Sequence, residues 1–456
     1  MPDSKSGGKH SIRSMTDAVN ELRDFAGGEN AGESRGEDAS PKDASPKKRV
    51  YGDESKHRAE RAEKTPRRKK KKRAKKRPGL LHRLLRTGKR IRRGDEERQL
   101  TFFGHRLSFW PMFLAVFAVL MVLVFLLNST NLVTDQQNVT LMGLPADLEN
   151  YRILVLSDLN GKRFGDRQST LLRQIDTLNY DIVVCLGDMV GKGGDAEPFY
   201  ELLEGLPASK KVYFICGDSD PGPYVDAVRE ESAPLSQLVL ADWILGAIDR
   251  GATYVDRPIA LTVGASTLWL TPSEMLNVDA YASSNLWKEQ MSQEESGYLA
   301  GVVADKNTLP FTSYRYQLAM EQLDSVNAMN DADVHITLSH VPCSDSFLTA
   351  ACGHSPTEGK YLSAPDIALA GHYCGGVWNL PLLGAFYVPD SSLPRYGWFP
   401  DQSVVSGLRQ IDEVQQYVSR GLSNCGDIPL MPFRLLNSPQ ISVITITATL
   451  PSSMLE

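Results

Sequence analysis

The chain has 456 residues, with 50 Lys and Arg against 55 Asp and Glu and a formal net charge of −5. That average describes no part of it. Residues 1–106 hold 31 basic and 16 acidic side chains (+15), residues 107–128 hold none, and residues 129–456 hold 19 and 39 (−20). The length allows more than one domain, and part of the chain is expected not to fold.

The first 66 residues are rich in Ser, Gly, Lys, Glu and Asp and poor in large apolar residues. Such a segment buries too little apolar surface to offset its ordering entropy, so residues 1–66 are predicted to form a disordered cytoplasmic arm. A basic segment, 67–106, follows, with 16 Lys and Arg and no acid between Arg67 and Arg93. We interpret it as contacting anionic lipid rather than nucleic acid, because this run has no aromatic residue for base stacking.

An apolar segment, 107–128, separates the basic and acidic parts. It has no ionisable side chain, and an apolar helix of roughly 20 residues crosses a bilayer core. We predict one transmembrane helix that acts as a signal anchor, with Trp110 near the interface. Because basic flanks resist translocation, this single-pass chain would keep its N-terminus in the cytoplasm and its acidic part outside the cell membrane. Residues 129–149 are interpreted as a linker.

Apolar runs alternate with helical patterns from residue 150 to residue 450. Five of the runs, RILVLSD, DIVVCLGD, KVYFICGD, DVHITLSH and DIALAGH, end in an acid or a histidine: Asp158, Asp188, Asp218, His340 and His372. This alternation predicts an α/β domain with a largely buried sheet, in which ligands gather at the carboxyl ends of the strands. Helix capping accounts for one acid after a strand, but five side chains of this kind favour a divalent metal site. We find no nucleophile elbow and no phosphate-binding P-loop.

These strand ends resemble the motif series of the calcineurin-like metallophosphoesterases, in their membrane-anchored bacterial branch. That family carries D-x-H, G-D, G-N-H-D/E, an isolated H and G-H-x-H after successive strands. This chain has SDLN, GD, GDSD, SH and GHYC in the same order, and the likeness covers roughly residues 151–449. The resemblance implies a layered α/β sandwich of two β-sheets flanked by helices, with a two-metal centre that cleaves phosphate esters.

Carried over by position, one metal site would use four residues: Asp188, Asp218, His340 and His372. The second would use Asp158, Asn160, Asp188 and Cys374. Asp218 replaces a family asparagine, and Asn160 and Cys374 replace two family histidines, so the motifs of the second site are degenerate. A thiolate binds zinc or iron but is a poor ligand for manganese. Ser219 replaces the catalytic histidine and cannot act as an acid near neutral pH, although its hydroxyl can bind a phosphate oxygen.

The expected cofactors are divalent Mn, Fe or Zn ions, with the first site complete and the second weakened. Three interpretations stay open. The chain is a phosphoesterase acting on a phosphomonoester, phosphodiester or pyrophosphate, with envelope lipids as one substrate class. Alternatively, it is an impaired homologue that binds a metal and a phosphorylated ligand, or a structural anchor whose strand-end residues are accidental. No nucleic-acid partner is expected, and the oligomeric state is open.

Two further features leave structural questions. Residues 275–330 match the family poorly and are predicted to form a variable insert with two helices, placed to cover the site and select substrates. Cys343 and Cys352 are either bridged or free, because their spacing alone does not fix the geometry of a disulfide. Cys185 and Cys216 lie inside apolar runs and are interpreted as small core residues.

Overall fold

The computed structural model describes residues 100–102, 105–107, 110, 111, 113–117, 119, 131–225, 233–301, 308–354, 359–380, 382–388, 390, 393–423 and 434–448. The predicted arm, most of the basic segment and most of the apolar segment 107–128 lie outside these residues. Within the described residues, none of the helices has the length and apolar character needed to cross a bilayer. In the N-terminal part, β1 (Leu100–Phe102) pairs with β2 (His105–Leu107) in antiparallel fashion.

The first of two large sheets has six strands in the described part of the chain, in the order β3-β16-β4-β5-β6-β7. Their bounds are β3 (Val133–Leu141), β4 (Arg152–Leu156), β5 (Ile182–Leu186), β6 (Lys211–Ile215), β7 (Ala252–Tyr254) and β16 (Gln440–Ala448). Strands β4 to β7 are parallel, while β16 is antiparallel to β4 and parallel to β3. The apolar runs of β4, β5 and β6 are buried on both faces, as parallel strands covered on both sides require.

The second sheet has the order β14-β15-β11-β10-β9-β8 in the same described residues. Its strands are β8 (Ile259–Val263), β9 (Ser266–Pro272), β10 (Val334–Leu338), β11 (Ile367–Ala370), β14 (Gly407–Ile411) and β15 (Val414–Val418). Strands β9, β10, β11 and β15 are parallel, and the edge strands β8 and β14 are antiparallel to their neighbours. Both sheets are therefore mixed.

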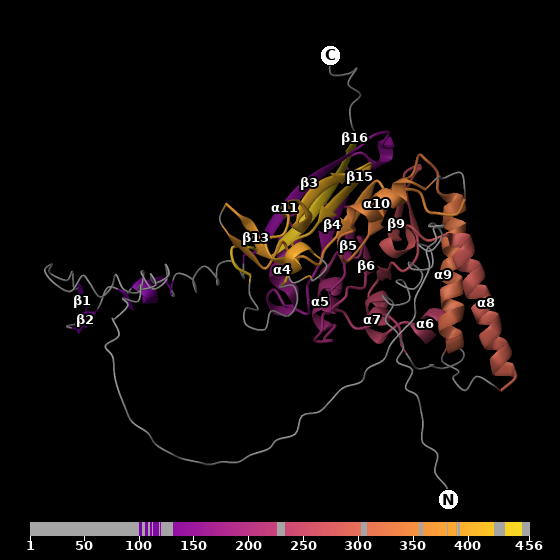
Figure 1. Cartoon of the computed structure of the whole chain (residues 1–456), viewed down its shortest axis with the longest axis horizontal. Helices are drawn as coiled ribbons and strands as arrows, with labels where there is room; N and C mark the ends of the chain where they lie inside the picture. The colour runs from indigo at the N-terminus through magenta and orange to yellow at the C-terminus, as the bar shows by residue number, and fades with distance from the viewer. Residues whose placement is uncertain are drawn as a thin grey trace, which may run out of the picture. The chain divides into compact units, whose positions relative to one another are not determined.

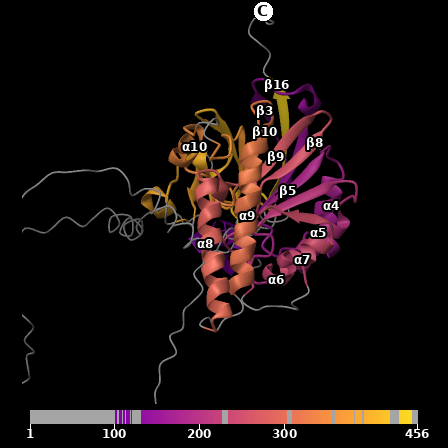
Figure 2. The same cartoon turned by 90° about the vertical axis from the view of Figure 1, so that its right-hand side faces the viewer.

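The main core lies between the two sheets, where Val155 and Val184 of the first pack with Ile336 and Leu369 of the second. Helices cover the outer faces (Figure 2). They are α4 (Ser169–Ile175), α5 (Glu197–Gly205), α6 (Leu235–Val239), α7 (Asp242–Asp249), α10 (Asp345–Cys352) and α11 (Gln402–Val405). The predicted sandwich of two sheets flanked by helices is confirmed.

The insert 275–330 contains two long helices, α8 (Ala280–Leu299) and α9 (Thr308–Ala328), as the sequence predicts. They lie side by side in both views and extend beyond the sandwich (Figures 1 and 2). A small hairpin of β12 (Trp378–Leu380) and β13 (Gly384–Tyr387) lies on the opposite side of the domain in Figure 1. Short 3-10 helices occupy Ala146–Leu148, Asp166–Gln168, Ser273–Met275 and Pro394–Gly397.

The structure differs from the linker predicted at 129–149. Residues Val133–Leu141 form β3, which pairs along its whole length with β16, so the folded domain begins before residue 150. β3 is an edge strand with mixed burial and five consecutive polar residues, the run TDQQN. Because it lacks the apolar run of the central strands, its sequence looks like a connection.

The cysteines 343 and 352 are both free thiols. Cys343 is buried in a small apolar cluster, and Cys352 packs against that cluster, to which α10 contributes most. The structure therefore favours two core thiols over a disulfide.

Candidate metal centre

The five strand-end residues meet at one edge of the sandwich. Asp158, Asp188 and Asp218 follow β4, β5 and β6 of the first sheet. His340 and His372 follow β10 and β11 of the second. Backbone hydrogen bonds join these turns: the Asp158 amide donates to Gly187, and the Gly371 amide donates to His340. The parallel order of the central strands brings all five turns to the same edge.

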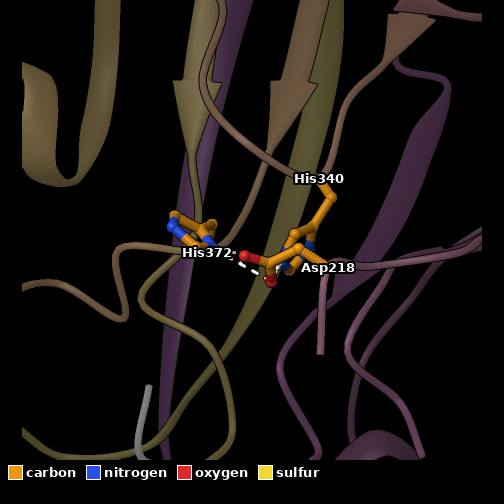
Figure 3. A group of neighbouring side chains, drawn as sticks. All are labelled: Asp218, His340 and His372. Atoms are coloured by element: carbon orange, nitrogen blue, oxygen red, sulfur yellow. Dashed lines mark hydrogen bonds and ion pairs between the residues drawn. The ribbon is translucent and has the colours of Figure 1, made fainter. Parts of the chain in front are cut away.

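Three of these side chains, Asp218, His340 and His372, point toward one another (Figure 3). Asp218 Oδ1 lies 3.1 Å from His340 Nε2 and 3.5 Å from His372 Nδ1. The two imidazole nitrogens are 3.2 Å apart. One carboxylate oxygen and two ring nitrogens at these distances form a donor set for a divalent transition metal.

The backbone of β5 orients His340. Its Nδ1 lies 2.8 Å from the carbonyl oxygen of Leu186, and since a carbonyl only accepts, Nδ1 carries the proton and donates. Nε2 is thereby directed at Asp218 and at Asp188, whose Oδ2 is 3.4 Å away. Burial alone would lower the pKa of His340, but the two carboxylates raise it well above its ordinary value. A backbone carbonyl on the far nitrogen is the support that metal-binding histidines commonly have.

A second group consists of Asp158, Asp188 and His340. Asp158 is completely buried, and neither of its carboxylate oxygens has a hydrogen-bond partner within the described residues. Burial raises the pKa of Asp158; His340 opposes that shift, and Asp188 adds to it. Because a buried, unpaired carboxylate is costly in free energy, this position fits a bound cation.

Two glycines allow the backbone to approach Asp158 and Asp188 closely. A Cβ atom at Gly217 would lie 2.2 Å from the amide nitrogen and Oδ1 of Asp188, and one at Gly421 would lie 2.6 Å from Oδ2 of Asp158. Such distances are far inside van der Waals contact, so neither position accepts a side chain without movement. The backbone at these two glycines therefore packs directly against the two aspartates.

The three aspartates of the centre differ in solvent exposure, and this difference leaves one side of the centre open. The Asp218 side chain is 55% exposed, whereas Asp158 and Asp188 are buried. Partial burial acts to raise the pKa of Asp218, but hydrogen bonds and charge from His340 and His372 hold it well below its ordinary value. Solvent and a substrate would thus reach the centre from the Asp218 side.

A sequence model of a protein family supports the same assignment. Residues 151–375 match the model described as calcineurin-like phosphoesterase, a stretch that includes all five strand-end residues. This part of the chain is similar in sequence to the calcineurin-like phosphoesterase family. Its members are metal-dependent phosphoesterases, and the carboxylate and imidazole groups of this centre suit their divalent metals.

Comparison with solved structures gives only distant likenesses. The phosphopantetheinyl hydrolase PptH from Mycobacterium tuberculosis is 11% identical, with a TM-score of 0.28, covering 63% of this chain and 96% of that one. Vacuolar protein sorting 29 from Cryptosporidium parvum is 9% identical, with a TM-score of 0.21, covering 61% and 78%. At such scores neither structure informs the substrate of this chain. No curated protein sequence matches the chain significantly.

The structure groups the predicted ligands differently from the family pattern. The sequence assigns Asp188 to both sites, whereas His340 is the residue common to the two observed groups. Cys374 belongs to neither group and is buried in an apolar cluster with Val377, Trp378 and Tyr387. An apolar environment suits a core thiol better than a metal-bound thiolate.

Asn160 and Ser219 contact Asp188 through their backbones. The Asn160 amide donates to the carbonyl oxygen of Asp188, 2.7 Å away. The Ser219 amide donates to Asp188 Oδ1 at 2.8 Å. Both residues therefore position the aspartate, whatever their side chains do.

Two residues that shape the centre were not singled out from the sequence. Asp220 accepts hydrogen bonds from the backbone amides of Val190, Gly191 and Gly217. Arg434 is buried and donates to the carbonyl oxygens of three residues in the loops beside Asp158: Arg420, Ser423 and Ser438. The last residue of the GDSD motif could have indicated a role for Asp220. No sequence pattern indicates a role for Arg434.

Proposed function

We propose that this chain is a metal-dependent phosphoesterase that hydrolyses a phosphomonoester, phosphodiester or pyrophosphate. Asp158 carries the proposal. Its buried carboxylate lacks a partner among the described residues and lies in a group with Asp188 and His340 at the strand ends. A buried carboxylate in this setting is stabilised by a cation.

Two ions would be held by the two groups. Asp218, His340 and His372 would hold one, and Asp158 and Asp188, with His340 between the groups, would hold the other. Oxygen and imidazole donors suit Mn, Fe or Zn. Such ions, when bound, supply charge neutralisation for a phosphoryl group and lower the pKa of water.

The chain's own residues arrange this centre and its approach. The Leu186 carbonyl fixes the His340 ring, and the Ser219 amide fixes the Asp188 carboxylate. The half-buried Ser219 lies next to the exposed Asp218, where its hydroxyl would donate a hydrogen bond to a phosphate oxygen. Since serine does not titrate near neutral pH, proton donation to the leaving group would come from solvent.

A second candidate function is a metal- and phosphate-binding module without turnover. The apolar surroundings of Cys374 favour it, because a sulfur in the core removes one donor from the second predicted site. The replacement of the family's catalytic histidine by Ser219 acts in the same direction. This candidate predicts ligand binding with no product.

We further propose that the apolar segment 107–128 anchors the domain to the cell membrane, with the basic segment 67–106 against anionic lipid. The support is the absence of ionisable residues in 107–128 and the charge asymmetry around it. An anchored domain would meet phosphorylated envelope lipids at high local concentration, so these are the proposed substrate class.

The test uses the full chain, purified in detergent. We expect elemental analysis to find two metal ions per chain after exposure to Mn, Fe or Zn, with hydrolysis of a generic phosphodiester. Asp188→Asn should reduce turnover by at least about 100-fold. Asp181→Asn is the matched control, because Asp181 lies at the opposite end of β5, where its side chain accepts a hydrogen bond from the Arg152 amide.

Other results of this experiment would change the proposed function. Bound metal with no turnover for any of the three ions would favour the binding module. Absence of metal would overturn both functions. Cys374→Ser should leave the metal content unchanged, and the loss of one ion would instead make Cys374 a ligand.

A further inference from the structure

The hairpin β12–β13 carries an exposed apolar surface beside the metal centre. It follows directly on the turn that holds His372 and Cys374. Neighbouring segments extend it on both sides, since Leu435 bridges to Trp378 and Trp398 bridges to Tyr387. We call the exposed apolar residues of this small platform the hairpin patch: Leu382, Leu383, Tyr396, Trp398, Phe399 and Leu436.

The hairpin patch is exposed and includes packed aromatic rings. Leu382 is fully exposed, Tyr396 is 76% exposed and Leu383 is 64% exposed. The partly buried Phe386 ring lies 4.7 Å from the Phe399 ring and 5.3 Å from the Trp398 ring of the patch. An ordered surface of large apolar side chains, presented to solvent by packed aromatic rings, is typical of an interaction site.

The backbone of the patch is unusual for a solvent-facing turn. Leu382, Tyr396, Phe399 and Leu436 all have φ between 49° and 69°. Glycine and asparagine adopt this conformation most readily, and bulky residues seldom do. The chain therefore keeps large apolar side chains at four positions where a purely structural turn would favour small or polar ones.

The polypeptide enters the domain at the same edge. Because β3 is parallel to β16 and β16 is antiparallel to β4, Val133 at the start of β3 lies at the carboxyl end of β4. The segment before β16 joins this entry to the hairpin. The Val133 amide donates to Pro439, and the Asn437 side chain donates to the carbonyl of Cys374.

The distance from this entry to the apolar segment is short. Only residues 129–132 separate segment 107–128 from Val133. Five residue steps of fully extended chain span at most about 18 Å. If segment 107–128 crosses a bilayer, the edge with Val133, the hairpin patch and the metal centre must lie close to the membrane surface.

We propose that the hairpin patch inserts into the interfacial layer of the bilayer that holds segment 107–128, so that the metal centre faces the lipid headgroups. This inference rests on the proposed anchoring. Leucines at the hairpin tip suit the acyl boundary, while Tyr396, Trp398 and the exposed Arg395 suit the headgroup region. A phosphorylated lipid would then reach the centre without leaving the membrane.

Photocrosslinking of the full chain tests the proposal. The chain is reconstituted in vesicles of phosphatidylcholine and phosphatidylglycerol, with p-benzoylphenylalanine replacing Leu383. The matched control replaces Met142, which is 89% exposed and follows β3 at the opposite edge of the sheet. We expect lipid adducts at position 383 at least about fivefold above those at position 142, with thermal melting of both variants as a check of folding.

Carbonate extraction of the same vesicles tests the membrane anchor separately from the membrane contact of the hairpin patch. A chain that resists extraction but gives equal adducts at positions 383 and 142 would overturn the membrane contact and leave the anchor intact. Crosslinking of position 383 to a second copy of the chain would overturn it too. A chain released by carbonate would overturn the anchor itself, and with it this inference.

Discussion

The carboxylate of Asp220 accepts a 2.8 Å hydrogen bond from the backbone amide of Gly191, and so joins the turn after β6 to the turn after β5. The same oxygen accepts from Val190, and the second oxygen accepts from Gly217 at 2.9 Å. These two turns carry Asp218 and Asp188. The spacing of the two metal-binding aspartates therefore depends on a third one.

Asp220→Asn should weaken this junction, because an amide has only one accepting oxygen while three amides need acceptors. We expect the metal-free domain to lose about 1–3 kcal/mol of stability and the affinity for Mn²⁺ to fall at least about tenfold. Manganese titration and urea unfolding of the full chain in detergent measure both. The control is Asp176→Asn, at an exposed carboxylate after α4. If it had an equal effect, the hydrogen bonds of Asp220 between the two turns would not be the cause.

Asp158→Asn should change stability in opposite directions without and with metal. A neutral amide removes the buried, unpaired charge, so the metal-free variant should be more stable than the parent by about 1–3 kcal/mol at pH 7. In excess Mn²⁺ the order should reverse, because the variant loses a ligand and with it the binding free energy. Melting curves with chelator and with metal test this. A metal-free variant less stable than the parent would mean that Asp158 has a structural partner.

Gly217→Ala should disrupt the centre through steric overlap alone. The new methyl group would lie 2.2 Å from two atoms of Asp188, and relief of that contact moves the carboxylate. We expect a loss of about 1–3 kcal/mol and at least tenfold weaker metal binding. Gly222→Ala is the matched control in the same loop, since a Cβ there has no atom within 4 Å. Equal behaviour of the two variants would rule out the close approach at Gly217.

His335 should make folding sensitive to mild acid. It is buried between the Thr271 hydroxyl and the Ser363 carbonyl, and burial lowers its pKa from 6.5 to about 4. Because the folded state binds the proton less readily than the unfolded state, stability is complete above pH 6.5 and falls as the pH drops toward 4. The loss between pH 7.5 and pH 5 should be about 2 kcal/mol.

Urea unfolding at the two pH values, with chelator present, measures this dependence. His335→Gln should remove it, whereas His354→Gln, at a histidine stacked on Tyr361 after α10, should keep it. An unchanged slope for His335→Gln would assign the acid sensitivity to other groups.

The centre was largely predictable from the sequence because its residues follow parallel strands. The run before Asp188 is apolar throughout and the run before His340 is mostly apolar, so the strands and their ends are visible in the sequence. Parallel strands bring their carboxyl ends together. The prediction of two packed sheets came from the family resemblance, because an apolar run in the sequence does not show which strand it will pair with.

Other features depend on contacts that no local pattern contains. β3 is an edge strand whose polar residues hide its pairing with β16. The burial of Cys374 reflects packing by Val377. The role of Arg434 reflects three carbonyl groups that the fold gathers around its side chain. Such assignments require the tertiary structure.

The ligands of the centre come from both sheets, with the carboxylates on one and the imidazoles on the other. A metal ion bound there would therefore link the two sheets. Its complete set of ligands would exist only when the two sheets are packed together. Ion binding would then come late in folding and would mainly slow the separation of the layers. Chelation should accordingly shorten the lifetime of the folded domain far more than it slows its formation.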